Sequence, residues 1–398
     1  MYPNKNYLKL SKNYLFSEIG KRIAEYERAA GKKALRLSIG DVTLPLAPIV
    51  IEAMKKAVEE MGRAETFRGY GEEQGYLFLR EAIAKNYERY GVTVNAEDVF
   101  VSDGAKSDCG NLGDLFAPKN KVLLPDPVYP AYCDANIIAG RKILYMQADE
   151  KNEFLPMPDC NVNADIIYLC SPNNPTGAAY SVRQLEKWTE YALKKNAVIL
   201  YDAAYACFIP EEDAKNGIAR SVYEAAGAQQ CAIEIRSFSK SAGFTGVRCG
   251  YCVVPSVLKR KGVSLKEIWK RRQGAKFNGV SYIVQRGAEA ALSEEGIRQN
   301  GEKIGYYMRN AQMIAQRLRN CGVFCTGGKY APYVWMKRPY GKTDEEFFAA
   351  LLSRTGIAVT PGNGFGRGGE GYMRLSAFCS AETAEEACAR LENFLKQT

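Results

Sequence analysis

The sequence predicts an α/β protein, with a large domain built on a mostly parallel seven-stranded sheet and a smaller α+β domain. From Val99 onward, short apolar runs alternate with helical patterns, which is typical of parallel strands joined by helices. Beyond Val280 the pattern changes to a long helical region followed by a few short strands. We expect residues 1–47 to form an N-terminal arm and part of the small domain, 48–285 the large domain, and 286–398 the C-terminal small domain.

The first 90 residues carry signals for helices and one short strand. A helix is expected from Ser17, as its N-cap, to Ala30 before a glycine. A strand is expected at residues 35–39. Two further helices, separated by a glycine-punctuated loop at residues 68–75, are expected at residues 49–61 and 77–90.

Seven apolar runs between residues 99 and 253 predict the large sheet. Helices are expected between them, most clearly at residues 182–195. Ligand-binding residues of such sheets collect in the loops after the carboxyl ends of the strands, so the polar clusters there are candidates for a site. The expected strands are residues 99–102, 121–124, 142–146, 166–170, 197–201, 232–235 and 249–253. In the last 120 residues we expect strands at 333–337, 357–360 and 372–376 and helices at 344–355 and 383–396.

Composition excludes several classes of function. The net charge of +9 is not concentrated in one block and accompanies no nucleic-acid-binding motif, so no nucleic-acid partner is expected. No apolar run is long enough to span a bilayer, and the first residues lack a secretory apolar segment. We therefore expect a cytoplasmic protein without a membrane partner.

The chain has no histidine, which removes Ser-His-Asp and Cys-His catalysis and histidine-based metal sites. We expect no metal, and proton transfer must use a lysine, carboxylate, cysteine or tyrosine. The 12 cysteines are spread through the chain, which favours reduced, buried thiols. Cys249 and Cys252 have the spacing of a redox or zinc motif. Since they lie in an apolar run without a second pair, we interpret both as core residues.

The stretch from Ser237 to Arg248 holds the best candidate for covalent chemistry. It follows an apolar run and places Lys240 between two serines. A lysine amine can form a Schiff base with a carbonyl, and the nearby hydroxyls and guanidinium can hold a phosphate. Pyridoxal phosphate requires both groups at once. A surface loop with an ordinary lysine is the alternative, because Ser-x-Ser-Lys is a short pattern.

Two earlier clusters follow predicted strands. At residues 102–106, backbone N–H groups could receive a phosphate, although a glycine turn that caps a helix has the same pattern. At residues 126–132, prolines stiffen the chain around Tyr129, whose ring could stack on a planar cofactor. A structural turn explains this second cluster equally well.

Two later clusters are more specific. Residues 171–177, Ser-Pro-Asn-Asn-Pro-Thr-Gly, constrain the chain with two prolines and a glycine, while Asn174 offers an amide to a ring substituent. Asp202 ends an apolar strand, where an unpaired carboxylate would be costly. It could pair with a protonated pyridinium nitrogen or cap the next helix. Tyr205 could donate to a phenolate oxygen of the same ring.

In this order on strand ends, Asn174, Asp202, Tyr205, Lys240 and Arg248 resemble the fold-type I aminotransferases, which depend on pyridoxal phosphate. The resemblance implies a fold-type I pyridoxal-phosphate transferase in which the lysine also becomes the base of the 1,3-proton shift. It further implies that Tyr129 stacks on the ring, that Asn174 and Tyr205 bind its hydroxyl oxygen, that Asp202 binds its nitrogen, and that Ala105, Lys106, Ser237, Ser239 and Arg248 hold the phosphate.

Further motifs are similar to the LL-diaminopimelate aminotransferase family over nearly the whole chain. The most specific are residues 14–16, Tyr-Leu-Phe, and 69–75, Gly-Tyr-Gly-Glu-Glu-Gln-Gly. Others are residues 13–16, 37–41, 277–281, 327–335, 360–366 and 374–378. By this similarity Arg374 grips the substrate α-carboxylate with help from Asn174, and Tyr14, Glu73 and Asn278 of the neighbouring subunit reach its distal groups, while Tyr70 of that subunit touches the phosphate. Gly40, Lys106 and Tyr129 are further expected substrate contacts.

The family resemblance implies a homodimeric aminotransferase with shared active sites. It would interconvert LL-2,6-diaminopimelate plus 2-oxoglutarate with tetrahydrodipicolinate plus glutamate by a ping-pong mechanism, in lysine and cell-wall precursor synthesis. Two alternatives stay open: a related aminotransferase that uses aspartate or an aromatic amino acid, and a non-catalytic regulator that binds the cofactor. Glu73, in a glycine-rich loop, could also be only a solvated charge.

Overall fold

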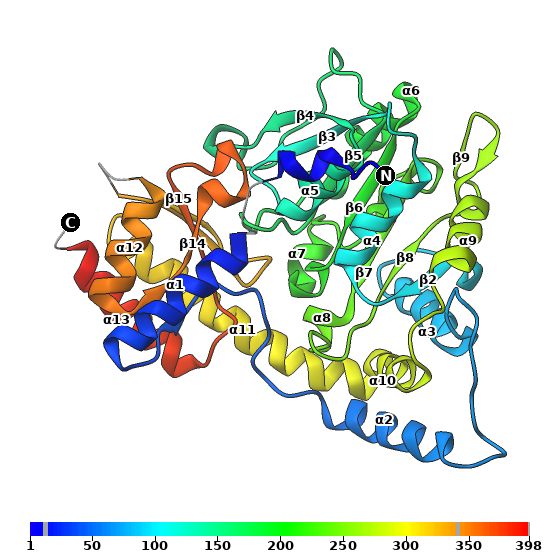
Figure 1. Cartoon of the computed structure of the whole chain (residues 1–398), viewed down its shortest axis with the longest axis horizontal. Coiled ribbons are helices and arrows are strands. Elements are labelled where there is room, and N and C mark those ends of the chain that lie inside the picture. Colours follow the sequence, from blue (N-terminus) through cyan, green and yellow to red (C-terminus); the bar gives the residue numbers. More distant parts are fainter. Residues whose placement is uncertain (11–14, 340–342, 397–398) are drawn as a thin grey trace.

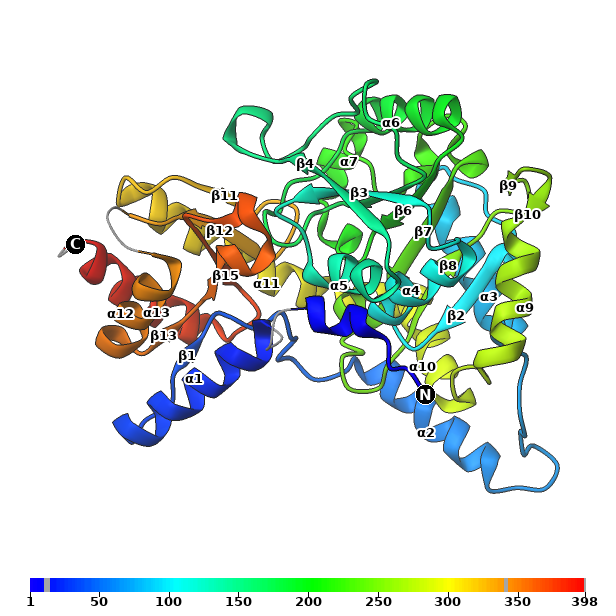
Figure 2. The same ribbon diagram turned by 45° about the horizontal axis from the view of Figure 1, so that its top comes forward.

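The computed structural model describes residues 1–10, 15–339 and 343–396, and its larger part is built on a seven-stranded sheet (Figures 1 and 2). Its strand order is β2-β8-β7-β6-β5-β3-β4, and only β8 runs antiparallel to its neighbours. The predicted mostly parallel seven-stranded sheet is thus confirmed. The strands are β2 (Val99–Ser102), β3 (Lys121–Asp126), β4 (Lys142–Gln147), β5 (Ile166–Cys170), β6 (Val198–Asp202), β7 (Ala232–Ser237) and β8 (Gly250–Val253).

Helices cover both faces of this sheet, because successive side chains of a strand point to opposite faces and both sets are apolar here. Leu123, Ile167 and Tyr201 face one hydrophobic cluster, which contains residues of α2 (Pro48–Met61), α3 (Leu77–Glu88), α6 (Val182–Lys195) and α10 (Tyr282–Leu292). Val122 and Leu200 face a second cluster, with residues of α4 (Ala105–Asn111), α5 (Pro130–Ile138) and α9 (Leu265–Lys276).

The smaller part combines the C-terminal third of the chain with residues near the N-terminus. Its antiparallel sheet has the order β11 (Cys325–Gly327), β12 (Tyr333–Lys337), β15 (Tyr372–Ser376) and β14 (Thr360–Pro361). A separate parallel pair joins β1 (Leu35–Arg36) to β13 (Ile357–Ala358). One hydrophobic cluster unites residues of α1 (Leu15–Ala30), α11 (Glu294–Asn320), α12 (Asp344–Thr355) and α13 (Ala381–Leu395). The sequence-based division at residues 47 and 285 stays a prediction.

Long helix α11 runs from the larger part into the smaller one, so both parts share one rigid element (Figure 1). At the N-terminus, the short 3₁₀ helix η1 (Lys5–Lys9) lies against α5, where Nδ2 of Asn4 donates to the carbonyl of Ile138 at 3.0 Å. Further short elements are α7 (Glu211–Lys215), α8 (Phe238–Ser241) and the hairpin of β9 (Lys259–Arg260) and β10 (Val263–Ser264).

Three local predictions were wrong. The single strand expected at residues 357–360 is divided into β13, which pairs with β1, and β14, which pairs with β15. Ser17 is not an N-cap, because α1 already includes Leu15 and Phe16. The strand expected at residues 35–39 ends at Arg36, because its partner β13 has only two paired residues. Beyond it, the carbonyl of Ser38 accepts from the side chains of Thr360 and Arg374 instead of a neighbouring strand. That segment borders the cavity described below.

All 12 cysteines are free thiols, and Cys249 and Cys252 are buried in the core, which confirms the sequence interpretation. Within the described residues, no helix has both the length and the apolar character required to cross a bilayer.

Candidate active site

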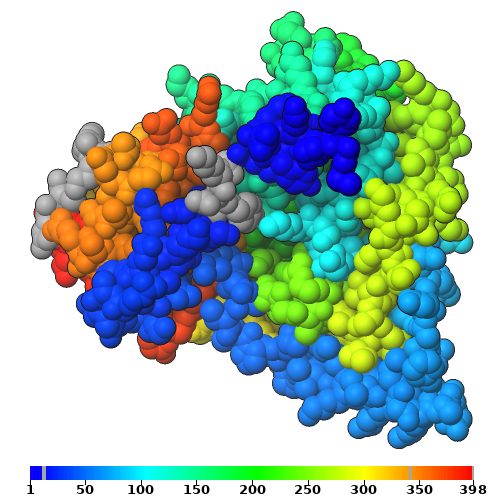
Figure 3. All heavy atoms as spheres, viewed as in Figure 1, coloured from blue at the N-terminus to red at the C-terminus, as the bar shows by residue number. Residues whose placement is uncertain are grey.

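A cavity of about 410 Å³ lies where the carboxyl ends of β5, β6 and β7 face the smaller part of the molecule. On the face seen in Figure 1, the surface is hollowed above the green atoms of α8 (Figure 3). The cavity brings together residues from nine segments of the sequence. Predicted site residues that line it are Gly40, Ala105, Lys106, Tyr129, Asn174, Asp202, Tyr205, Ser237, Ser239, Lys240, Arg248 and Arg374.

Lys240 extends from α8, the short helix that follows β7. Its Nζ donates to the carbonyl oxygen of Gly40 and lies 5.2 Å from the ring centre of Phe378. Burial lowers the pKa of this amine to about 8; the charges of Arg374 and Arg248 act in the same direction, and Asp41 opposes them. Near neutral pH the amine can therefore exist in its neutral, nucleophilic form.

Asp202, at the end of β6, is a buried carboxylate. Oδ2 accepts from the hydroxyl of Tyr132 at 2.5 Å and from the thiol of Cys109 at 3.6 Å, and Oδ1 accepts from the backbone N–H of Ala204 at 3.0 Å. Burial nevertheless raises its pKa. No cation among the described residues forms an ion pair with it. The carboxylate is thus held in place by three hydrogen bonds and has room for a cationic partner that none of the described residues supplies.

Arg374 of β15 is only 1% exposed. Nη1 donates to Oδ1 of Asn174 at 2.7 Å, and Nη2 donates to the carbonyl of Ser38 at 2.8 Å. Nε has no hydrogen-bond partner, and no carboxylate of the described residues pairs with the guanidinium. Since a buried charge is costly unless paired, this arginine is suited to a carboxylate ligand.

Two tyrosines lie beside this arginine. The hydroxyls of Tyr205 and Tyr333 are 2.7 Å apart, and the Tyr333 ring centre is 4.5 Å from the Arg374 guanidinium carbon. Burial raises the pKa of Tyr205 well above its usual value, so the hydroxyl stays protonated and can donate. A Cβ at Gly40 would lie 2.3 Å from the Tyr333 hydroxyl, so this position requires glycine.

The opposite end of the cavity collects hydrogen-bond donors. Nη1 of Arg248 donates to Oγ of Ser239 at 3.3 Å, and Oγ of Ser237 accepts from the backbone N–H of Ser239 at 3.1 Å. Arg248 adopts a left-handed backbone conformation with φ of 65°, which directs its side chain inward at some conformational cost. A Cβ at Gly104 would lie 2.3 Å from Nη2 of Arg248. Glycine therefore allows the guanidinium to approach the start of α4.

The structure leaves three predicted residues outside this cavity. Tyr70 is 90% exposed, and Glu73 and Asn278 are absent from the cavity wall. Glu73 and Asn278 lie near each other, because a Cβ at Gly279 would be 3.9 Å from Cα of Glu73. Tyr14 falls outside the described residues.

Sequence reasoning missed Tyr132 and Tyr333 as site residues. Both lie in motifs that the sequence singled out, at residues 126–132 and 327–335. Their positions in the fold explain why they matter: Tyr132 hydrogen-bonds Asp202, and Tyr333 contacts both Tyr205 and Arg374. A tyrosine in a short motif does not reveal such a partner, because the partners are distant in the chain.

The family model for aminotransferase class I and II matches residues 32–391. The chain belongs to the class I and II aminotransferases. It is 50% identical to the LL-diaminopimelate aminotransferase of Lachnospira eligens over 98% of each chain, and 48% identical to that of Parabacteroides distasonis over 99% of each. The solved structure of LL-diaminopimelate aminotransferase from Chlamydomonas reinhardtii superposes with a TM-score of 0.92 at 39% identity, covering 99% of this chain and 98% of that chain.

Class I and II aminotransferases depend on pyridoxal phosphate, and the cavity fits that group. Asp202 lacks a cation that a protonated ring nitrogen would provide. Lys240 offers the aldehyde an amine whose pKa is lowered to about 8. Ser239 and Arg248 offer donors for the phosphate, near the glycine at position 104. These three features match the three functional groups of the cofactor.

The lowered pKa of Lys240 predicts how cofactor loading depends on pH. Only the neutral amine attacks a carbonyl, so the rate at which apoprotein acquires the visible absorbance of bound pyridoxal phosphate should rise through a midpoint at about pH 8. Stopped-flow absorbance between pH 6 and 10 measures this rate. A midpoint near the ordinary lysine value would contradict the effect of burial. The Lys240→Arg variant serves as the control that should not load.

Proposed function

We propose that this protein is an LL-diaminopimelate aminotransferase, which interconverts LL-2,6-diaminopimelate plus 2-oxoglutarate with tetrahydrodipicolinate plus glutamate. Two side chains in one cavity support the proposal most strongly. Lys240 has a pKa of about 8, and the buried Arg374 has no carboxylate partner among the described residues. The high identity to relatives of this name over nearly their full length supports the choice of substrate.

Pyridoxal phosphate, when bound, supplies a carbonyl for amino groups and an electron sink for the bonds at the substrate α-carbon. Nζ of Lys240 holds the cofactor and then moves the proton at the substrate α-carbon, for which a pKa of about 8 is well matched. Asp202 would hold the ring nitrogen and keep it protonated. The amino group passes in two half-reactions, from the donor and then to the acceptor.

The remaining residues bind and orient. The hydroxyl of Tyr205 and Nδ2 of Asn174 would donate to the ring oxygen of the cofactor, and the ring of Tyr129 would cover one face of the cofactor ring. Arg374 binds the α-carboxylate, and its bond to Oδ1 of Asn174 keeps the amide oriented. The phosphate is bound by Ala105, Lys106, Ser237, Ser239 and Arg248, all of which line the cavity.

We further propose that a homodimer completes each site. Tyr70, Glu73 and Asn278 lie outside the cavity of their own chain, so they would act in the other subunit, with Tyr14 as a fourth contributor. Large apolar side chains near Tyr70 support a protein interface there: Phe67 is 61% exposed and Leu77 is 48% exposed in the single chain. The partner subunit's Glu73 would bind the distal ammonium of diaminopimelate.

Hybrid dimers test this sharing. Lys240→Ala and Glu73→Gln chains, mixed under conditions that exchange subunits, should regain about a quarter of wild-type activity, because half of the dimers are hybrids and each hybrid has one intact site. If Glu73 acted within its own chain, no hybrid site would be intact. Mixing Lys240→Ala with Arg374→Leu is the matched control and should restore no activity, because both residues belong to one chain's cavity.

The choice of donor is tested by transamination assays with LL-diaminopimelate, its meso isomer and aspartate. We expect LL-diaminopimelate to be the best donor. Glu73→Gln should lower its kcat/KM by about tenfold, the value of one charge-assisted hydrogen bond, and leave aspartate unaffected. Preferred turnover of aspartate or an aromatic amino acid would favour the related aminotransferases, and no turnover of any donor would favour a non-catalytic regulator.

A further inference from the structure

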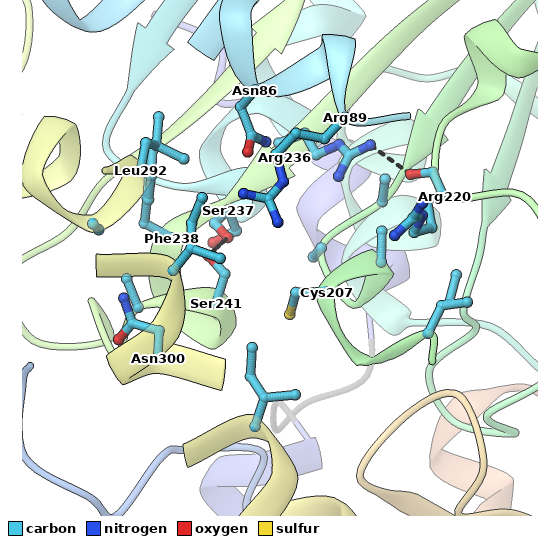
Figure 4. A pocket seen from close by; sticks show the side chains of 18 of the residues that line it. Asn86, Arg89, Cys207, Arg220, Arg236, Ser237, Phe238, Ser241, Leu292 and Asn300 are labelled. Atoms are coloured by element: carbon cyan, nitrogen blue, oxygen red, sulfur yellow. Dashed lines mark hydrogen bonds between the residues drawn. The ribbon is translucent and has the colours of Figure 1, made fainter. Parts of the chain in front are cut away.

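A second cavity, of about 240 Å³, lies behind the active site, and we call it the rear cavity (Figure 4). It is bordered by the loop after β6, the segment Ser237–Ala242 and the start of α11. Ser237 and Ala204 line both cavities, so a single wall separates the rear cavity from the site of Lys240. A water molecule occupies about 30 Å³, so the rear cavity can hold much more than one trapped water.

The rear cavity contains a buried amide without a partner. Asn300 on α11 is 5% exposed, and its Oδ1 has no hydrogen-bond partner in the described part of the chain. Figure 4 shows Asn300, Cys207 and Arg236 around the same opening. Leaving a buried amide oxygen unpaired costs about 1–3 kcal/mol, so the position is suited to a ligand that donates a hydrogen bond.

The opposite wall of the rear cavity is cationic. Arg89, Arg220 and Arg236 line it, and none of the described residues in the wall is acidic. Arg236 donates through Nε to Glu234 at 2.6 Å and through Nη2 to the carbonyl of Arg220, which leaves Nη1 without a partner among the described residues. Arg220 forms an ion pair through Nη1 with Glu211 at 2.6 Å, and its buried Nε has no partner. The unused donors favour an anion.

The rest of the wall is mainly uncharged. Ala206, Ala242, Leu292 and Ile304 line the same cavity and provide apolar surface. Burial raises the pKa of Cys207 to about 12, so its thiol is neutral near pH 7 and does not repel an anion. The wall thus offers unpaired arginine donors, apolar surface and the unpaired acceptor Oδ1 of Asn300.

We propose that the rear cavity is a second ligand site, for a small carboxylate whose short apolar chain ends in a hydrogen-bond donor. The carboxylate contacts the arginines, and the donor contacts Asn300. This site is separate from the binding of the aminotransferase substrates and does not rest on which donor the enzyme uses.

The test is calorimetric titration of the holoenzyme with 5-hydroxypentanoate. Two comparators each lack one group: pentanoate has no hydroxyl, and 1,5-pentanediol has no charge. We expect 5-hydroxypentanoate to bind, and pentanoate and the diol to bind about tenfold more weakly. No binding of 5-hydroxypentanoate at 20 mM, or equal binding of the diol, would overturn the proposal.

Variants distinguish the two cavities. Asn300→Leu should weaken the binding of 5-hydroxypentanoate about tenfold and leave the binding of pentanoate unchanged. Arg89→Gln, at an exposed position, should weaken the binding of both compounds. Arg374→Gln, in the active site, should leave the binding of 5-hydroxypentanoate intact. Loss of binding in Arg374→Gln with retention in Asn300→Leu and Arg89→Gln would place the ligand in the active site and overturn the proposal.

Discussion

Replacing Lys240 with alanine is expected to lower turnover by at least about 10⁴-fold and to abolish the visible absorbance of lysine-bound cofactor. Lys240 faces the cavity described above with a pKa lowered to about 8 by burial, and the charges of Asp41, Arg248 and Arg374 act on it. The variant removes both the covalent anchor and the base at the substrate α-carbon. No neighbouring histidine can replace that base, since the chain has none.

Steady-state kinetics and absorbance spectra check this prediction together. Lys194→Ala, an exposed position on α6, is the matched control and should change neither measurement. Addition of a small amine such as ethylamine should restore part of the Lys240→Ala activity, because the cavity left by the side chain admits a soluble base. If Lys240→Ala kept the visible absorbance, Lys240 would not be the residue that holds the cofactor covalently.

Arg374→Lys is expected to lower kcat/KM for every amino acid donor by about 10²–10³-fold while the cofactor absorbance persists. The planar guanidinium holds Asn174 and the carbonyl of Ser38 while its remaining donors face the cavity. An ammonium keeps the charge but cannot make these bonds and a two-point contact to a carboxylate at once. The loss should appear mainly in KM, because the carboxylate is bound in both the ground state and the transition state.

Arg298→Lys, on the exposed side of α11, is the control for this substitution and should behave as wild type. Equal kinetics of Arg374→Lys and wild type would contradict a two-point contact with the substrate carboxylate. A simultaneous loss of cofactor absorbance would indicate instead that Arg374 supports the cofactor site, through Asn174 and Tyr333.

Sequence patterns alone determined the large sheet and the order of the candidate residues. Apolar runs of four or five residues marked all seven strands of the sheet to within one or two residues, because buried parallel strands are apolar on both faces. The predicted helices at residues 182–195 and 344–355 agree with α6 and α12, each of which begins after a side-chain cap. Positions just after strands also identified Asn174, Asp202, Tyr205 and Lys240 as candidate site residues. Side chains at the carboxyl ends of parallel strands share one edge of a sheet.

Only the tertiary structure decided which distant side chains meet. The sequence does not show that Arg374 reaches Asn174, 200 positions away, or that Tyr132 hydrogen-bonds Asp202. The pKa of Lys240 likewise depends on burial beneath residues from the N-terminal segment and the C-terminal sheet. Local sequence patterns indicate the backbone conformation of a segment and which of its faces is buried. Hydrogen bonds, charge pairs and desolvation depend instead on residues that folding brings together from separate parts of the chain.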